Sequence, residues 1–382
     1  MKTFIKNEKG VALMLVLSSV LILTTIVVEF AFNSHVSYEL ASSERDRLKA
    51  YYLARSGLNL ARLELKLEKD LRVRFASLLQ NLPGNSVPSD PLCKQVPLST
   101  GLLKGISSGE ITESAKSFLN FDGDFDVSCD TEERKVNLNV FRTDPGTSST
   151  SDTLSLYDSQ KSLLFSLLSG KEFEAIFKGK PDEIRKVVNA IADWADRDDR
   201  INEAPGISGG SEEALYMGPD YHYKPKNGKY TSVAELLLVA GVGDDIYKKL
   251  SPQITIYGDH RIHICQASEE LVKAFISRFA MTSLGIAPIS PTDNSKWTAI
   301  QKMIHLACNQ ASPQITSIAN AIGGFLGLSD SRGLASQITT TNRFYRIEAN
   351  GSVNDSKVRL TTVIDAGQAS PNLWKTLYFR VE

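Results

Sequence analysis

Residue types that carry chemistry in enzymes and metalloproteins are scarce in this chain of 382 residues, which has only four cysteines and five histidines. Cys93, Cys129, Cys265 and Cys308 lie far apart in the sequence. Neither a Cys-x-x-Cys pair nor a Cys/His ligand spacing occurs, which argues against a zinc site. In an oxidising compartment Cys93 and Cys129 are candidates for a disulfide, although spacing leaves the connectivity of the four cysteines open.

The chain also lacks an excess of charge of either sign. It has 43 Lys and Arg against 44 Asp and Glu, a formal net charge of −1, and no long basic run. Such a balance argues against a nucleic-acid surface. No nucleophile–base motif or phosphate-cradling glycine loop is present, and the histidines are scattered. We therefore expect a protein that is not an enzyme and that does not bind nucleic acid.

Charge is absent altogether between Val11 and Val28. These eighteen residues, at about 1.5 Å of rise each, give a helix of roughly 27 Å, close to the hydrocarbon thickness of a bilayer. Three lysines lie before Gly10, and Glu29 follows the run. This charge pattern predicts a single transmembrane helix at 11–28, with the N-terminus in the cytoplasm and the body of the protein across the membrane. In a bacterial inner membrane, that orientation places the body in the periplasm.

The order of basic leader, Gly10 and apolar helix has several interpretations. A cleaved secretory signal has a shorter apolar core and a small-residue cleavage site, whereas no Ala-x-Ala ending follows this one. A plain one-pass anchor explains the apolar run but not the glycine. The order resembles a class III signal of the type IV pilin kind. In such a signal prepilin peptidase cuts between Gly10 and Val11, and the new N-terminus is methylated.

Beyond the apolar run, helical and strand patterns alternate along the chain. A helical pattern with period near 3.6 continues from Phe30 to Asp70 and returns at 154–195. The dipeptide Asn350-Gly351 is a turn signal between two of the predicted strands. Alternating residues predict antiparallel strands at 118–127, 135–141, 342–349, 357–364 and 374–381.

A second helical pattern follows at 230–252, where Gly241 and Gly243 separate two short helical stretches. Thr231 or Ser232 is expected to cap the first stretch, with Glu235 nearby. Helix, Gly-Val-Gly turn, helix is typical of a helix-hairpin-helix. In a DNA-binding protein lysines lie near such a turn, whereas here two aspartates follow it. We interpret this segment as a packing module.

These patterns predict an α+β fold. A long N-terminal helix, first transmembrane and then amphipathic, is expected to pack on an antiparallel, pilin-like sheet. A large, mostly α-helical insert with helix-hairpin-helix or SAM-like character interrupts that sheet. The expected divisions are a leader peptide at 1–10, the transmembrane helix at 11–28, the first part of the pilin-like domain at 29–142, the helical insert at 153–340 and the C-terminal strands at 341–382.

Carboxylates gather in one segment of the insert, at 193–199, and again at Glu212-Glu213 after a glycine-rich loop. Several carboxylates on a helix end and the next loop repel one another unless a cation binds, and Ca²⁺ accepts six to eight oxygen ligands in irregular geometry. The spacing is not that of an EF-hand loop. The alternative is a solvated acidic helix end that Arg197 and Arg200 partly neutralise.

The chain resembles protein K of the bacterial type II secretion system, a family of large minor pseudopilins. The leader junction from Gly10 to Leu13, the strand 136–139 and the helical segment 232–242 are similar to parts of that family. So is the acidic stretch, through Asp193, Trp194, Asp196, Asp198, Asp199, Gly210, Glu212 and Tyr216. The segment 261–266 departs from the pattern, because His263, Cys265 and Gln266 replace the residues usual there.

The resemblance implies a function. After cleavage the protein would assemble with the I and J minor pseudopilins and other pseudopilus subunits, and would start and cap a periplasmic filament that exports folded proteins. Leu15 stands where major subunits carry a glutamate, which suits a subunit at the filament tip. In that family the helical insert binds calcium. The resemblance therefore implies that the candidate calcium ligands of this chain are Asp193, Asp196, Asp198, Asp199, Glu212 and Glu213.

Two other functions remain open at this level. A minor pilin of a type IV pilus or uptake machine would share the signal but typically lack the large helical insert. A membrane-anchored periplasmic protein that binds calcium or nucleic acid would keep its anchor uncut. The Gly10 junction separates this last class from the other two, and the acidic insert separates the secretion pseudopilin from the minor pilin.

Overall fold

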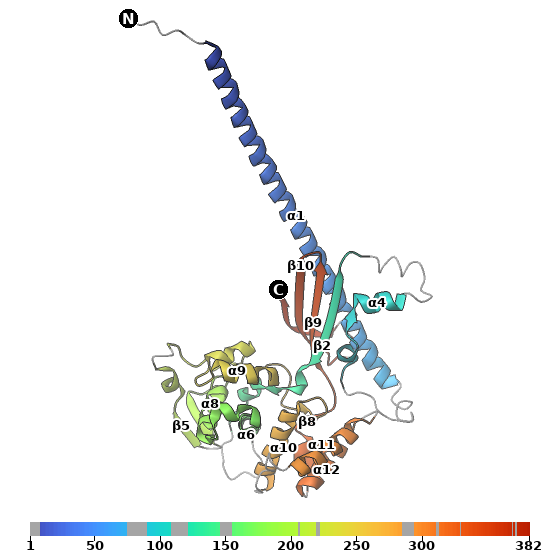
Figure 1. Ribbon diagram of the computed structural model, residues 1–382. Coiled ribbons are helices and arrows are strands. Elements are labelled where there is room, and N and C mark those ends of the chain that lie inside the picture. The colour runs from blue at the N-terminus through green and yellow to red at the C-terminus, as the bar shows by residue number, and fades with distance from the viewer. Residues whose placement is uncertain are drawn as a thin grey trace.

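The chain folds into a long helix, a sheet packed on the second half of that helix, and a mostly helical unit at the far end (Figure 1). The computed structural model describes residues 8–74, 90–107, 121–145, 155–204, 207–218, 222–284, 294–310, 313–328, 330–368, 370 and 373–382. The predicted leader 1–10 and the start of the predicted strand 118–127 lie partly outside these ranges.

Helix α1 (Glu8–Arg74) joins the predicted apolar run and the predicted amphipathic stretch into one element of 67 residues. At 1.5 Å per residue it is about 100 Å long. Side chains of its apolar first half are exposed in the isolated chain. Its second half buries a stripe on one face that recurs every three or four residues, namely Ala50, Ala54, Leu58, Ala61 and Leu65. That stripe packs on the sheet.

The sheet has five strands in the order β1-β2-β9-β10-β11, and each neighbouring pair is antiparallel. The strands are β1 (Leu98–Ser99), β2 (Asp124–Thr131), β9 (Phe344–Val353), β10 (Ser356–Asp365) and β11 (Lys375–Val381). Two short helices, α3 (Leu92–Gln95) and α4 (Thr100–Ser107), flank β1. A helix on an antiparallel sheet, with a helical unit inserted between β2 and β9, confirms the predicted α+β fold.

The predicted turn at Asn350-Gly351 is wrong. Both residues lie inside β9, where they pair with Arg359 and Val358 of β10, and the hairpin turns instead at Asn354, whose φ is 50°. Gly351 occurs in the strand because α1 crosses it closely. A Cβ at this position would lie 2.0 Å from the carbonyl oxygen of Ala50. The glycine therefore marks a close approach of helix and strand.

The helical unit has its own hydrophobic core, separate from the core between α1 and the sheet. Short two-stranded pairs join its helices: β3 (Val136–Asn137) with β6 (Ile254–Thr255), β4 (Arg200–Ala204) with β5 (Ile207–Ser211), and β7 (Ile262–His263) with β8 (Ile338–Thr339). Its helices are α6 (Leu156–Leu168), α7 (Glu174–Phe177), α8 (Pro181–Asp193), α9 (Asp244–Leu250), α10 (Glu269–Leu284), α11 (Asn294–Cys308), α12 (Ile315–Leu326) and α13 (Arg332–Ala335).

Among the described residues, the 3₁₀ turns are η1 (Glu132–Arg134), η2 (Leu138–Arg142), η3 (Lys171–Phe173), η4 (Glu212–Tyr216), η5 (Val233–Leu238) and η6 (Ser251–Gln253). The expected cap of the 230–252 segment is confirmed, because Ser232 and Glu235 form a capping box at the start of η5. The turn after η5 leads into α9, with Gly241 at a φ of 81°.

The strand predicted at 135–141 is mostly wrong. Only Val136 and Asn137 are extended, and η2 follows because the side-chain oxygen of Asn137 accepts a hydrogen bond from the Asn139 backbone at 2.9 Å. Val136, Leu138 and Phe141 are buried in the core of the helical unit. In the structure the pilin-like part therefore ends with β2 at Thr131, ahead of the expected boundary at 142.

Two adjacent carboxylates lie where the chain passes from the sheet into the helical unit. Glu132 is fully buried and accepts a hydrogen bond from Arg346 of β9 at 2.7 Å, and another from the Thr255 hydroxyl of β6. One oxygen of Glu133 accepts the backbone N–H groups of Arg343 and Phe344 at 2.6 and 2.8 Å. Burial raises the pKa of Glu133 to about 7. These carboxylates join the two units.

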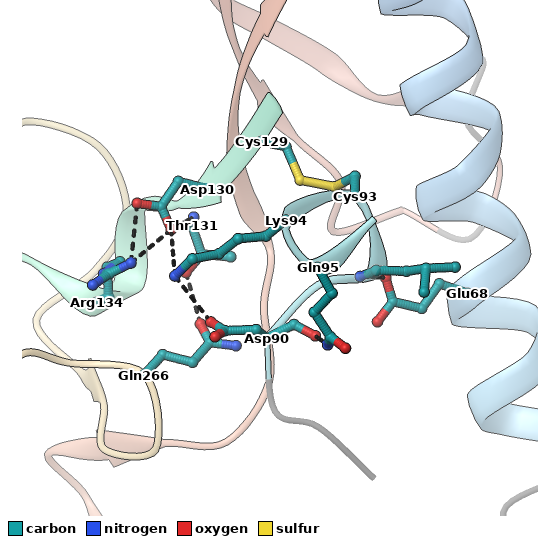
Figure 2. The surroundings of a disulfide bond; sticks show 11 residues. Glu68, Asp90, Cys93, Lys94, Gln95, Cys129, Asp130, Thr131, Arg134 and Gln266 are labelled. Atoms are coloured by element: carbon teal, nitrogen blue, oxygen red, sulfur yellow. Dashed lines mark hydrogen bonds and ion pairs between the residues drawn. A yellow bond between two sulfur atoms is a disulfide. The ribbon is translucent and has the colours of Figure 1, made fainter. Parts of the chain in front are cut away.

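A disulfide lies beside this junction (Figure 2). Cys93 of α3 is bonded to Cys129 of β2, with their Cα atoms 5.7 Å apart, so the structure contains the pair that the sequence left open. Next to it, Lys94 lies 3.4 Å from Asp130, and Arg134 lies 3.0 Å from the same carboxylate. A second disulfide, Cys265–Cys308, ties α11 to the segment after β7.

Candidate metal centre in the helical unit

Three buried carboxylates meet where α8 ends and the β4–β5 hairpin returns. Asp193 is the last residue of α8, Asp196 lies in the turn that follows, and Glu212 begins η4 directly after β5. The hairpin brings Glu212 back because Arg200 pairs with Ser211, and the Glu212 N–H then bonds the Asp199 carbonyl at 3.2 Å. One oxygen from each of the three carboxylates lies within 4.8 Å of the others.

The partners of these carboxylates leave several oxygens unmatched. The Tyr157 hydroxyl donates to Asp196 at 2.9 Å, and the Asn202 side chain donates to the same oxygen at 3.1 Å. Within the part of the chain that the structure describes, Asp193 Oδ2, Asp196 Oδ1 and both carboxylate oxygens of Glu212 are buried without a hydrogen-bond partner. Buried oxygens of this kind are costly unless a cation binds them.

The electrostatics agree with the geometry. Burial, reinforced by repulsion between the carboxylates, raises the pKa of Glu212 to about 9 and that of Asp193 to about 8. Burial likewise raises the pKa of Asp196 to about 7. Three acids that resist ionisation together are the expected signature of a site built around a positive charge.

The other three calcium candidates lie at the edge of this cluster or outside it. Asp198 is exposed and accepts the Arg200 backbone N–H at 2.9 Å. Asp199 accepts from the Asn227 side chain at 2.9 Å. Glu213 is ion-paired with Lys224 at 3.0 Å. The structure therefore brings together Asp193, Asp196 and Glu212, and it places the remaining carboxylates on the surface around them.

Four residues that support the cluster were not among the sequence candidates. Tyr157 and Lys161 come from α6, Arg142 from η2 and Asn202 from β4. The Arg142 guanidinium donates to the carbonyls of Ala195 and Asp196 at 3.1 and 2.9 Å, which fixes the turn that carries Asp196. No local sequence signal points to α6 or η2, because both reach the acidic turn only through the core of the helical unit.

Lys161 supplies a buried positive charge near the three acids. It is 8% exposed, its ammonium group donates to the Asn202 carbonyl, and it lies over the Tyr157 ring. Burial lowers its pKa, whereas the charge of Asp193 raises it. One lysine offsets part of the charge of three carboxylates. The oxygen donors that remain fit a hard divalent cation such as Ca²⁺ better than a thiol- or imidazole-preferring metal.

The predicted cleavage site lies in the exposed first turns of α1. Gly10 is exposed there, as are Val11 at 61% and Leu15 at 65%. Among the described residues, α1 is the one helix long and apolar enough to cross a membrane. The structure therefore supports an N-terminal membrane anchor, and the processing of this segment stays a prediction.

Comparison with known families bears on the helical unit. Residues 135–259 match the family described as type II secretion system (T2SS), protein K. This segment of the chain is similar to a protein K domain. It spans η2, α6–α9 and the whole carboxylate cluster, which confirms the family resemblance seen in the sequence. The family is described as part of a secretion system.

A solved structure extends the likeness of the fold beyond residues 135–259. It is titled the crystal structure of the GspK-GspI-GspJ complex from the enterotoxigenic Escherichia coli type 2 secretion system. The similarity covers 90% of this chain and 99% of the matched chain, with a TM-score of 0.52 and 13% sequence identity. At that identity the match establishes a shared fold. No curated protein sequence matches the chain.

Proposed function

We propose that this protein is a minor pseudopilin of a type II secretion system and that it assembles with the I and J minor pseudopilins at the tip of a periplasmic pseudopilus. The similarity of residues 135–259 to protein K carries this proposal. The solved structure with the same fold is itself titled as a complex of GspK with GspI and GspJ. A filament subunit of this kind starts assembly and takes part in the export of folded proteins across the outer membrane.

The position of the helical unit supports a place at the tip. It lies at the end of the molecule away from the N-terminus of α1, beyond the sheet (Figure 1). Suppose that all subunits of the filament are anchored in the membrane by parallel N-terminal helices. The next subunit farther from the membrane would then have to pack beyond that end of this molecule. The helical unit occupies this space, so the protein fits as the first subunit, with later subunits added beneath it.

Leu15 is consistent with the same position. The resemblance to pseudopilins implies that a glutamate at this place pairs with the N-terminal amine of a neighbouring subunit. Leu15 offers no charge, and an apolar side chain in the bilayer costs nothing. A subunit that has no neighbour above it does not need the carboxylate.

Processing of the leader provides a direct test. Replacing Gly10 by valine is expected to block cleavage by prepilin peptidase, so that the intact mass retains residues 1–10 and secretion of folded proteins falls. Ser18→Ala, inside the same helix, is the control and should be processed normally. A G10V protein with the mature mass and normal secretion would refute the pseudopilin proposal.

The carboxylate cluster is proposed as a calcium site within this function. Asp193, Asp196 and Glu212 would hold the ion, and its charge would neutralise the acids that bring α8, the β4–β5 hairpin and η4 together. Their unmatched buried oxygens support this assignment. Titration calorimetry of the protein stripped with chelator tests it: binding of calcium in preference to magnesium is expected, and no heat with either ion would remove the site.

A further inference from the structure

A pocket of about 510 Å³ opens on the surface of the helical unit, apart from the residues of the carboxylate cluster. The end of α7, the middle of α8 and the turn between η5 and α9 line it. Val187, Ala190 and Ile246 form part of its wall and are themselves buried at 6%, 2% and 6% exposure. Because these side chains belong to the core, the wall is fixed before any ligand arrives.

Apolar surface reaches the solvent at one side of this pocket. Leu215 of η4 lines it and is 37% exposed. Gly241 lies opposite α8, and a Cβ there would be 3.3 Å from the Val187 side chain. A larger residue at 241 would therefore narrow the pocket. An apolar hollow of this size matches the range of volumes found for ligand sites.

Three lysines surround the apolar part. Lys186 of α8 is ion-paired with Glu183 at 3.3 Å, and both residues line the pocket. Lys178 and Lys180 line it as well and are exposed. Neither has an ion-pair partner among the residues that the structure describes. After the Glu183 pair is counted, two positive charges remain beside an apolar hollow.

The backbone holds these two lysines in place. Lys178 ends α7 in the left-handed conformation, with φ 49°, and Gly179 follows with φ 69°. A side chain with a Cβ costs roughly 1–2 kcal/mol in that conformation, where glycine is the usual residue. The chain nevertheless has lysine at 178, so the turn Lys178-Gly179-Lys180 presents charge on both sides of its glycine.

We propose that this pocket binds a short segment of another protein, which inserts one or two apolar side chains and carries carboxylates that face Lys178 and Lys180. Charge complementarity selects an acidic segment, and the apolar wall supplies the contact area. The proposal is independent of the assembly with I and J pseudopilins, since the pocket is complete within one chain.

The test uses the full chain in phosphatidylcholine nanodiscs and a fluorescein-labelled peptide, Gly-Asp-Leu-Phe-Glu-Gly, followed by fluorescence anisotropy. The amide peptide Gly-Asn-Leu-Phe-Gln-Gly and the peptide Gly-Asp-Ser-Ser-Glu-Gly serve as comparison probes. The acidic apolar peptide is expected to bind about tenfold more tightly than either, and raising the salt from 50 to 300 mM should weaken it.

Variants locate the binding on the chain. The double variant K178E/K180E is expected to weaken the acidic peptide at least tenfold, and L215S several-fold, while circular dichroism melting shows both folded. The matched control K229E/K302E changes the net charge equally on exposed lysines elsewhere and should leave the affinity within twofold.

Three results would overturn the proposal. They are equal affinity for the acidic and amide peptides, equal loss in the control and pocket variants, or no peptide binding. Binding of decanoate with no peptide binding would assign the pocket to a fatty acid and also overturn it. None of these results bears on whether the chain assembles into a pseudopilus, so the two proposals fail separately.

Discussion

At the scale of single residues, Asp193 and Glu212 carry the metal proposal. Without a cation, burial and mutual repulsion hold the pKa of both groups well above the values they have in the unfolded chain, which costs stability at neutral pH. D193N and E212Q remove these ionisable groups, so both are expected to raise the melting temperature of the calcium-free protein. Both should also lose the upward shift that calcium gives the wild type, because binding to the folded state alone raises stability. Thermal melts in chelator and in 1 mM calcium measure both effects.

Glu213 provides the matched control for these variants. It adjoins Glu212 in sequence but is paired with Lys224, so E213Q should keep the calcium shift. A full shift in E212Q together with a lost shift in E213Q would contradict the site.

The acidic segment itself could be predicted, because the carboxylates of 193–199 are close in sequence. Which of them are buried could not. Glu212 joins the site only through the register of the β4–β5 hairpin, and Asp198 and Asp199 turn outward in the same few residues. Tyr157 and Lys161 were missed because their contact with the turn depends on how α6 packs against α8. Sequence spacing therefore indicated the chemistry, and tertiary packing selected the residues.

Glu133 at the junction of the two units gives a pH-dependent prediction. Its pKa is raised in the folded state, so its protonated form favours folding and the folded protein loses stability as pH rises from about 4.5 to about 7. E133Q removes this titration. The wild type should therefore lose on the order of 3 kcal/mol relative to E133Q over that interval.

Urea unfolding at several pH values measures this difference. Glu44→Gln, on the exposed face of α1, is the control and should follow the wild type at every pH. A constant difference between wild type and E133Q from pH 4.5 to 8 would contradict the role assigned to Glu133.

At the scale of elements, the contact between α1 and β9 depends on Gly351. A Cβ there would lie 2.0 Å from the Ala50 carbonyl, so helix and strand would have to separate. We expect G351A to lower the free energy of unfolding by roughly 1–3 kcal/mol, the usual cost of overpacking. In α12, Gly324 has no atom within 4 Å of such a Cβ, so G324A should be neutral or stabilising. Denaturant unfolding of both variants tests this, and equal destabilisation would refute it.

The disulfide between α3 and β2 should stabilise the unit formed by the sheet and α1. The two cysteines are 36 residues apart, and chain-entropy reasoning assigns such a loop about 4 kcal/mol. C93S/C129S is therefore expected to lower the free energy of unfolding by up to that amount. Chemical denaturation under non-reducing conditions checks it. An unchanged unfolding midpoint would show that the bond constrains little.

The elements show where sequence patterns suffice. The apolar run and the amphipathic stripe predicted α1, and strict alternation predicted β9 and β10 to within a few residues. Asn350-Gly351 was misinterpreted because a glycine required by a neighbouring helix has the same local signal as one required by a turn. The strand predicted at 135–141 failed for a related reason, since the Asn137 side chain starts a 3₁₀ turn after two extended residues.

At the scale of the whole molecule, three parts follow one another: the apolar half of α1, the sheet packed on the second half of α1, and the helical unit beyond the sheet, which contains the segment similar to protein K. That order leaves the helical unit at the end of the molecule away from the apolar helix, where the proposed tip position requires it (Figure 1). Within that proposal, the neighbours of this chain are the I and J minor pseudopilins.

Co-expression with the I and J pseudopilins of the same genome tests this claim most directly. The full chains are solubilised, purified through a tag on this protein and analysed by size-exclusion chromatography and native mass spectrometry. The account predicts a complex with one copy of each chain that survives purification. Recovery of this protein alone, folded and with neither partner in any fraction, would contradict it and favour a membrane-anchored protein that acts by itself.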